Sequence, residues 1–235
     1  MAKKKLTPVQ KRLDTDLWII LIITLAVLSV YIYLQNQVSA FSKNSDRNIL
    51  LRVLLSAACQ FGVAGLGISI VAVIRKESFH SYGLRKKGAI TSIALCIFCC
   101  IPYIIVTFAT GQFTGYLPFK TLLTTNDVLA SGFPTNVIGF LVTAVAWGFF
   151  EGFNFVVISN KINRRYPSKN KWLNWGAIAC SIACILIHGA VGITAESILK
   201  MITIIISIYG MLLVNEFTGN AWGCIFVFLF LWNAF

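Results

Sequence analysis

The chain has 235 residues, of which 57% are hydrophobic and only 12% are charged. Several apolar segments reach the ~17 to 25 residues that a helix needs to cross a bilayer. This composition excludes a soluble globular enzyme. It predicts an all-α fold, a polytopic membrane bundle of about seven transmembrane helices.

The net charge of +12 is of the size seen in nucleic-acid-binding proteins, but the positions of the charges argue against a nucleic acid partner. Fifteen of the 20 Lys and Arg residues form three clusters: Lys3, Lys4, Lys5, Lys11 and Arg12; Arg75, Lys76, Arg85, Lys86 and Lys87; Lys161, Arg164, Arg165, Lys169 and Lys171. The clusters lie before the first span and then in every second loop, which is the positive-inside pattern. We therefore expect a cytoplasmic N-terminus and membrane lipid as the surrounding partner.

The chain is expected to divide into a basic cytoplasmic tail at 1–16, N-terminal transmembrane helices at 17–79 and a main membrane domain at 80–235. The first apolar run is longer than the ~7 to 15 residues of a cleaved signal core, although 38–40 also resembles a cleavage site. The predicted spans are 17–34, 49–74, 89–109, 136–160, 174–193, 198–214 and 221–235.

The second predicted span carries polar and small residues that point to helix packing. Gly62, Gly65 and Gly67 let helices approach closely, and they lack the strand-turn-helix context of a nucleotide loop. Gln60 is expected to form an interhelical hydrogen bond, and Arg52 to extend toward the membrane interface. The seven cysteines all lie in apolar runs, so we interpret them as packing residues rather than as disulfides or zinc ligands.

The segment at 110–135 is the longest loop expected on the outer side, and it is unusually apolar. Its apolar residues are Phe113, Tyr116, Leu117, Phe119, Leu122 and Leu123. Two interpretations stay open: the segment lies on the membrane interface, or it forms a lid over a substrate entrance.

Two ionisable groups lie inside consecutive apolar runs. A charged group at membrane depth costs at least ~2.5 to 3.5 kcal/mol, so Glu151 and His188 are functional-site candidates. If the chain turns at 167–170, their distances from the turn are roughly 24 and 27 Å at ~1.5 Å per residue. The two groups are therefore expected to face each other, as an acid/base pair that holds a reactive water.

Further polar residues accompany this pair. Thr143, Trp147, Glu151 and Asn154 follow spacings of four, four and three, which predicts one polar helix face toward a cavity or a partner. Cys184 precedes His188 by one helical turn. Each ionisable group alone also fits a structural role, such as a helix cap or an interhelical hydrogen bond. The presence of both on consecutive helices favours chemistry.

Several motifs in the second part of the chain lie in a recognisable order. They are SYGLRKK at 81–87, AWGFFEGFNF at 146–155, the basic pair at 164–165, CILIHG at 184–189, TGNAW at 218–222 and LWNAF at 231–235. Together they resemble the CPBP family, which contains CAAX prenyl endopeptidases and membrane proteins of bacteriocin processing or immunity. The resemblance covers roughly residues 80 to 235.

The resemblance implies an intramembrane endopeptidase that cleaves a membrane-anchored peptide or protein. In this family the Glu matched by Glu151 activates water, the His matched by His188 assists, and a last-helix Asn, matched approximately by Asn233, helps to stabilise the oxyanion. Asn154 and Asn220 are further oxyanion candidates from the sequence. We expect Trp147, Asn154, Asn220 and Cys184 to surround the substrate cavity.

The sequence also departs from the family pattern of Glu-Glu-x-x-x-Arg, Phe-x-x-x-His and a last helix with His and Asn. Gly152 stands at the second Glu, Val156 at the Arg, Cys184 at the Phe and Phe228 at the last-helix His. Asn233 lies one residue beyond the strict spacing, where Trp232 stands.

These departures bear on the cofactor. Members of the family are often labelled metalloproteases, but Glu151 and His188 alone fall short of the three protein ligands usual for catalytic zinc. No cofactor is therefore certain, and a divalent metal such as zinc is the only candidate. Glu151 as a general base, made more basic by apolar surroundings, needs no metal.

Two functions remain from the sequence. The first is a CPBP-like endopeptidase acting near the cytoplasmic side, as a multi-pass protein of the bacterial plasma membrane. The alternative is a non-catalytic relative that serves in bacteriocin immunity or in partner binding. A small transporter is a weaker third possibility, because the sequence has neither inverted repeats nor paired broken helices.

Overall fold

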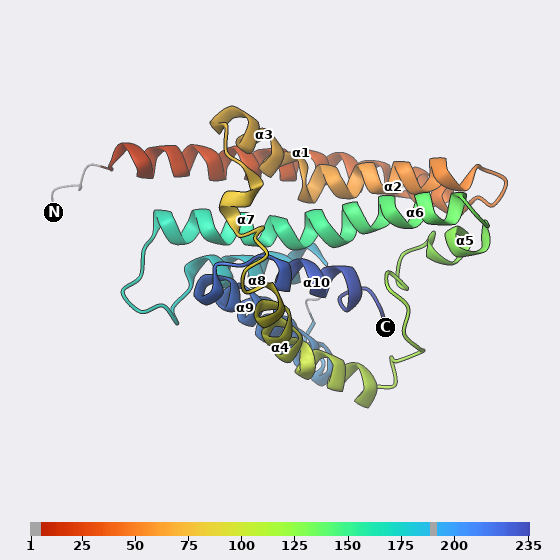
Figure 1. The fold of residues 1–235 in the computed structure, drawn as a ribbon. Coiled ribbons are helices and arrows are strands. Elements are labelled where there is room, and N and C mark those ends of the chain that lie inside the picture. The colour runs from red at the N-terminus through yellow and green to blue at the C-terminus, as the bar shows by residue number, and fades with distance from the viewer. Residues whose placement is uncertain (1–5, 189–191) are drawn as a thin grey trace.

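The computed structural model describes residues 6–188 and 192–235, and the regular elements there are all helical (Figure 1). In chain order they are α1 (Pro8–Lys43), α2 (Ile49–Ala64), α3 (Leu66–Arg75), η1 (Phe79–Tyr82), α4 (Ala89–Ala109), α5 (Thr125–Ala130), α6 (Thr135–Thr143), the π-helical η2 (Ala144–Phe150), α7 (Glu151–Arg165), α8 (Trp175–Ile187), α9 (Ala195–Thr218) and α10 (Trp222–Phe230). The prediction of an all-helical fold is confirmed for this part of the chain.

Four helical stretches are long and apolar enough to cross a membrane: α1, α4, α9 and the continuous run Thr135–Arg165. The pair α2 and α3, bent by 57° at Gly65, makes a fifth if it counts as one span. Helices α8 and α10 occupy the remaining two predicted spans but have only 13 and 9 residues. The described residues thus contain four or five helices of spanning length, as expected of a membrane protein.

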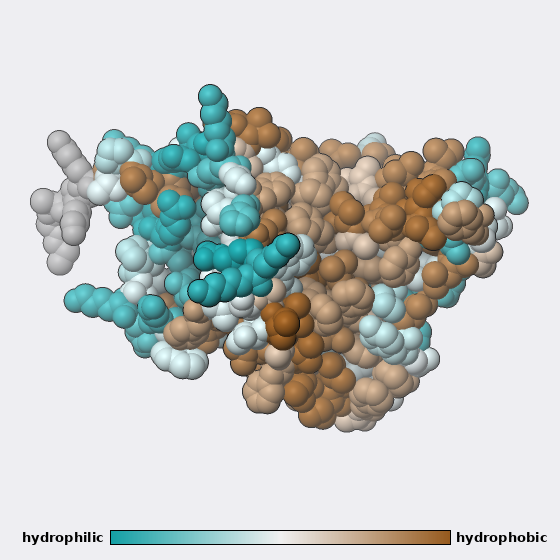
Figure 2. All heavy atoms as spheres, viewed as in Figure 1, coloured by the Kyte–Doolittle hydropathy of each residue, from teal (hydrophilic) through white to brown (hydrophobic). Residues whose placement is uncertain are grey.

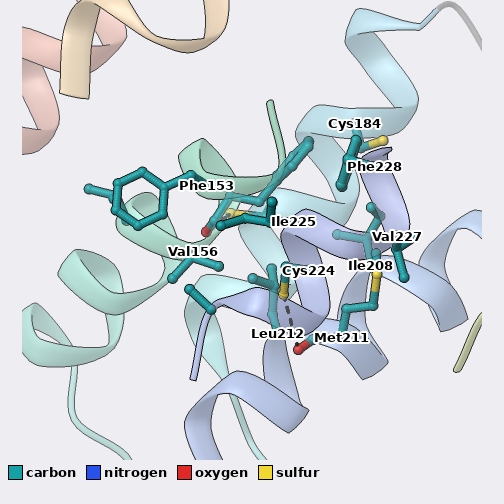
Figure 3. Packing of buried hydrophobic residues seen from close by; sticks show 14 of the residues in the cluster. Phe153, Val156, Cys184, Ile208, Met211, Leu212, Cys224, Ile225, Val227 and Phe228 are labelled. Atoms are coloured by element: carbon teal, nitrogen blue, oxygen red, sulfur yellow. Dashed lines mark hydrogen bonds between the residues drawn. The ribbon is translucent and has the colours of Figure 1, made fainter. Parts of the chain in front are cut away.

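The helices form two groups around a shared core (Figure 1). Helices α1 and α2 run alongside the α6–α7 span, whereas α4 and α9 cross them obliquely, and α10 lies between this span and α4. Figure 3 shows the core between α7, α9 and α10, where Phe153, Val156, Ile208, Met211 and Ile225 are fully buried. Burial of this apolar surface between helices fixes the position of α7, which carries the candidate site.

The cysteines behave as the sequence predicts. All seven are free, and five of them are buried. Cys224 donates a weak hydrogen bond of 3.4 Å to the carbonyl of Met211 within the core (Figure 3). They are packing residues.

The glycines of α2 and α3 bring these helices close to α1. A Cβ atom on Gly62 would lie 2.7 Å from a methyl group of Val27, and one on Gly67 would lie 3.1 Å from the Cα atom of Ile20. The sequence interpretation of these glycines as packing residues is confirmed.

Helix α1 is longer than the sequence suggested. It begins at Pro8, where the side chains of Thr7 and Gln10 each bond to the other's backbone N–H, and it continues to Lys43. Residues 8–16, expected as a tail, and 35–43, expected as a loop, are therefore helical. A capping box with Pro at the first helical position strongly favours this start.

Arg52 does not extend to the membrane interface as expected. Its side chain is buried, donates to the carbonyl of Ser42 at 2.7 Å and pairs with Asp127 at 2.5 Å. It therefore ties the last turns of α1 and the start of α2 to α5. The sequence could not show this, because its acidic partner lies 75 residues away.

A buried ion-pair network joins α1, α7 and the loop after α3. Lys161 is 1% exposed and pairs with Asp16 at 2.9 Å and with Glu77 at 3.1 Å. Asp16 also pairs with Arg75 at 2.7 Å. Partial burial raises the pKa of Glu77, but hydrogen bonds from Tyr82 and Lys161 outweigh it and hold that pKa below its ordinary value. Lys161 thus belongs to the protein interior rather than to a loop.

This network lies at the basic end of the molecule, where α1 begins and α7 ends. Figure 2 shows hydrophilic residues around this end and hydrophobic residues over the middle. The distribution is the one expected for a bilayer around the middle of the helices.

Candidate functional site

The structure brings Glu151 and His188 together. Glu151 is the first residue of α7 and is 6% exposed, and His188 directly follows α8. The Nε2 atom of His188 lies 3.5 Å from the Oε1 atom of Glu151. A carboxylate and an imidazole at this separation can exchange a proton directly or through one water.

A π-helical segment directly precedes Glu151. Such stretches are rare, and they are often found at functional sites. Residues of η2 include Trp147, which lines the same cavity as Glu151. The expected polar face is formed only in part: Thr143 bonds back to the carbonyl of Gly139 at 2.9 Å, and neither Thr143 nor Asn154 lines the cavity.

Gln60 on α2 completes the surroundings of the carboxylate. Its Nε2 atom donates a hydrogen bond of 2.7 Å to the Oε2 atom of Glu151. The sequence predicted an interhelical hydrogen bond for Gln60, and the structure identifies Glu151 as the acceptor. Glu151 therefore has one oxygen held by an amide and the other facing an imidazole.

These groups lie on the wall of a cavity of about 390 Å³. The lining residues that carry its chemistry are Tyr31, Ser42, Gln60, Trp147, Glu151 and His188. Among the described residues that line it there is no Lys or Arg, and Glu151 is the only carboxylate. The cavity thus suits an uncharged segment next to a single ionisable pair.

The cavity extends away from the basic end of the molecule. Ser39 and Ser42 come from the last turns of α1, and residues 121–124 come from the loop before α5. Lys161 and the basic loops lie at the opposite ends of α1 and α7. The cavity therefore leads from Glu151 away from the basic end, which is the end that the sequence predicts to be cytoplasmic.

The apolar segment before α5 closes part of this cavity. Leu117 N–H donates to the carbonyl of Ala234 at 3.0 Å, and Thr121 N–H donates to that of Asn233 at 3.3 Å. Phe119 is 1% exposed and packs on Phe140 with ring centroids 5.6 Å apart. This part of the segment, residues 117–124, packs on protein, which favours the lid interpretation for it over a position on the membrane interface.

Asn233 lies in the cavity as the sequence suggested. Its Oδ1 atom accepts a hydrogen bond of 3.3 Å from the hydroxyl of Thr121, so the amide nitrogen is the group left to meet a substrate oxygen. Asn233 is thus near the Glu151 pair while being anchored to the lid.

The structure places Asn220 and Cys184 outside the cavity. Asn220 is fully buried, and its side-chain nitrogen donates to the carbonyls of Arg85 and Lys87 at 2.8 and 3.0 Å. Its role is to join two loops, because an amide saturated in this way has no donor left. Cys184 is 1% exposed and belongs to the hydrophobic core (Figure 3).

No protein-family model, curated protein or solved structure matches this chain. The likeness to the CPBP family therefore rests on the sequence motifs alone.

At the positions where the sequence departs from that family pattern, the residues pack against neighbouring helices. Val156 is fully buried, and Phe228 stacks on Phe155 with ring centroids 5.4 Å apart. A Cβ atom on Gly152 would lie 3.0 Å from the Cα atom of Ile225. These positions hold α7 against α10 and have no room for further ionisable groups.

The crowding at Gly152 gives a direct prediction. Gly152→Ala is expected to lower the free energy of unfolding by about 1 to 3 kcal/mol, because backbone on α10 cannot yield as a side chain would. Thermal unfolding in detergent measures the change, and Val145→Ile on an exposed position of the same span is the matched control. Equal unfolding temperatures for Gly152→Ala and wild type would contradict the close contact.

The donors at the site do not fit a zinc ion. Within the described residues no three His, Cys, Asp or Glu side chains come together as a metal site would require. Glu151 and His188 supply two ligands, and the second oxygen of Glu151 is already bonded to Gln60. We therefore assign no step to a metal.

Proposed function

We propose that this chain is an intramembrane endopeptidase of the CPBP type, which hydrolyses a membrane-anchored peptide or protein with water activated by Glu151. We further propose seven membrane segments with a cytoplasmic N-terminus, α8 and α10 being the short ones, in a bacterial plasma membrane.

One observation carries this proposal: the buried carboxylate of Glu151 faces the imidazole of His188 at 3.5 Å on the wall of a cavity inside the spanning helices. Placing an ionisable pair in such surroundings is costly, and such pairs mark functional sites. A structural ion pair would not require a cavity beside it.

The geometry supports a simple sequence of steps. Glu151 removes a proton from a water molecule, and the oxygen of that water attacks the peptide carbonyl carbon. The amide nitrogen of Asn233 is the candidate donor to the oxyanion. As the carbon–nitrogen bond breaks, His188 passes a proton to the leaving amine and regains it from Glu151.

A second candidate is a non-catalytic relative that holds a partner peptide in the same cavity, as in bacteriocin immunity. Packing at Gly152, Val156 and Phe228 favours it, because three polar positions of the family pattern are used here for helix contacts. Both candidates predict peptide binding, and only the first predicts turnover.

The deciding experiment is cleavage of a pool of membrane-anchored peptides by the reconstituted protein in water enriched in ¹⁸O. The pool includes prenylated CAAX peptides and bacteriocin-leader peptides. The endopeptidase predicts new C-termini that carry ¹⁸O, detected by mass spectrometry. Binding of a peptide without any product would support the second candidate.

A further inference from the structure

Gln60 lines the cavity, and its side-chain amide donates a hydrogen bond to Glu151. It comes from α2, in the N-terminal part of the chain, and reaches across to the first residue of α7. The 2.7 Å bond from its amide to Oε2 is shorter than the 3.5 Å separation between Oε1 and His188.

We propose that Gln60 is a positioning residue, which fixes the orientation of the Glu151 carboxylate so that Oε1 is the oxygen that takes the proton from water. This inference rests on the proposed function. It assigns to the N-terminal helices a part in catalysis rather than in anchoring alone.

A carboxylate group is free to rotate about the bond that joins it to its side chain. Its two oxygens are equivalent, and the group rotates easily unless a donor holds one of them. A hydrogen bond to a charged group is strong enough to hold it in an apolar environment. With Oε2 held by Gln60, Oε1 is directed toward His188 and the cavity.

The choice of an amide is chemically important. An Arg or Lys at this position would also hold the carboxylate, but its positive charge would lower the basicity of Glu151. A neutral amide orients the base and leaves it a base. Four other titratable groups lie around Glu151 in the described part of the chain. They are His188, which directly follows α8, Cys184 of α8, Tyr31 of α1 and Cys59 of α2.

Gln60 is itself held in place. One helical turn before it, the hydroxyl groups of Ser56 and Ser42 are 2.9 Å apart, and Arg52 anchors the start of α2. On its other side Gly62 packs against Val27. Because Gln60 is held on both sides, it can in turn hold the carboxylate of Glu151 in one orientation.

The test compares Gln60→Met and Gln60→Glu with wild type. Met has a similar length but no donor, so kcat is expected to fall roughly 10- to 100-fold while KM changes little. The acid limb of the pH–rate profile is expected to move to higher pH, because the loss of this hydrogen bond disfavours the charged carboxylate. Gln60→Glu should move it further, because two adjacent carboxylates share a proton.

A matched control exists in the same chain. The side-chain amide of Gln112 donates to Glu196 at 2.6 Å, outside the cavity. Gln112→Met removes the same kind of bond and is expected to leave kcat and the pH profile unchanged. Equal profiles for Gln60→Met and wild type would overturn the inference, as would an equal effect of Gln112→Met.

A second measurement does not depend on turnover. A hydrophobic carbodiimide modifies protonated carboxyl groups in membranes, and mass spectrometry gives the labelled fraction of Glu151 at each pH. Labelling of the Gln60→Met protein is expected to persist to higher pH than that of wild type. If wild type cleaves nothing but this difference is present, the proposed function fails and the Gln60 contact stands; no difference overturns the contact's role.

Discussion

Glu151→Gln is expected to reduce peptide hydrolysis roughly 10²- to 10⁴-fold, the usual contribution of a general base. The amide has the size of the carboxylate and keeps a hydrogen-bonding group next to Gln60, but it cannot accept a proton from water. Peptide binding should therefore remain. The measurements are single-turnover cleavage and equilibrium binding of the same peptide.

Glu196→Gln is the matched control. Glu196 is exposed, accepts a hydrogen bond from Gln112 and does not line the cavity. It is expected to cleave as wild type does. Full activity of the Glu151→Gln protein would exclude Glu151 as the base. Loss of binding in both proteins would point to a folding defect instead.

Lys161→Met is expected to destabilise the protein by about 3 to 5 kcal/mol, the range found when one partner of a buried ion pair is removed. Asp16 is equally buried and would be left with Arg75 as its remaining ion-pair partner. Unfolding in lipid-detergent micelles followed by tryptophan fluorescence measures the change.

Two further proteins make the result specific. Lys169→Met replaces an exposed lysine of the loop after α7 and is expected to change stability by less than about 0.5 kcal/mol. Adding Asp16→Asn to Lys161→Met should recover part of the loss, because it removes the buried carboxylate that has lost one of its two ion-pair partners. A stability of Lys161→Met equal to that of wild type would show that the network is dispensable.

Hydrophobicity was sufficient to locate the helices. Within the described residues, each of the seven predicted apolar runs contains at least one helix, as expected of apolar segments in lipid. It was not sufficient for their lengths: α1 extends into polar sequence because Thr7 and Gln10 cap it, and α8 and α10 are short.

The site was predictable in part. Ionisable residues at membrane depth singled out Glu151 and His188, and the structure brings them together. The π-helical segment was invisible to a spacing of four, and Asn154, which was expected at the cavity, does not line it. Gln60 was expected to form an interhelical hydrogen bond, but the sequence could not name its acceptor, because this contact and those of Ser42 and the lid residues join distant segments.

Ion pairs hold the first turns of α1, and a hydrogen bond holds its last turn. Asp16 and Asp14 form the ion pairs at one end, and the carbonyl of Ser42 accepts from Arg52 at the other. The stretch between them, including Tyr31, forms a wall of the cavity and has an exposed outer face. For a substrate that stays in the bilayer, encounter is then two-dimensional diffusion along this wall. Its rate would follow the mole fraction of substrate in the lipid and fall when lipid is added at constant total substrate.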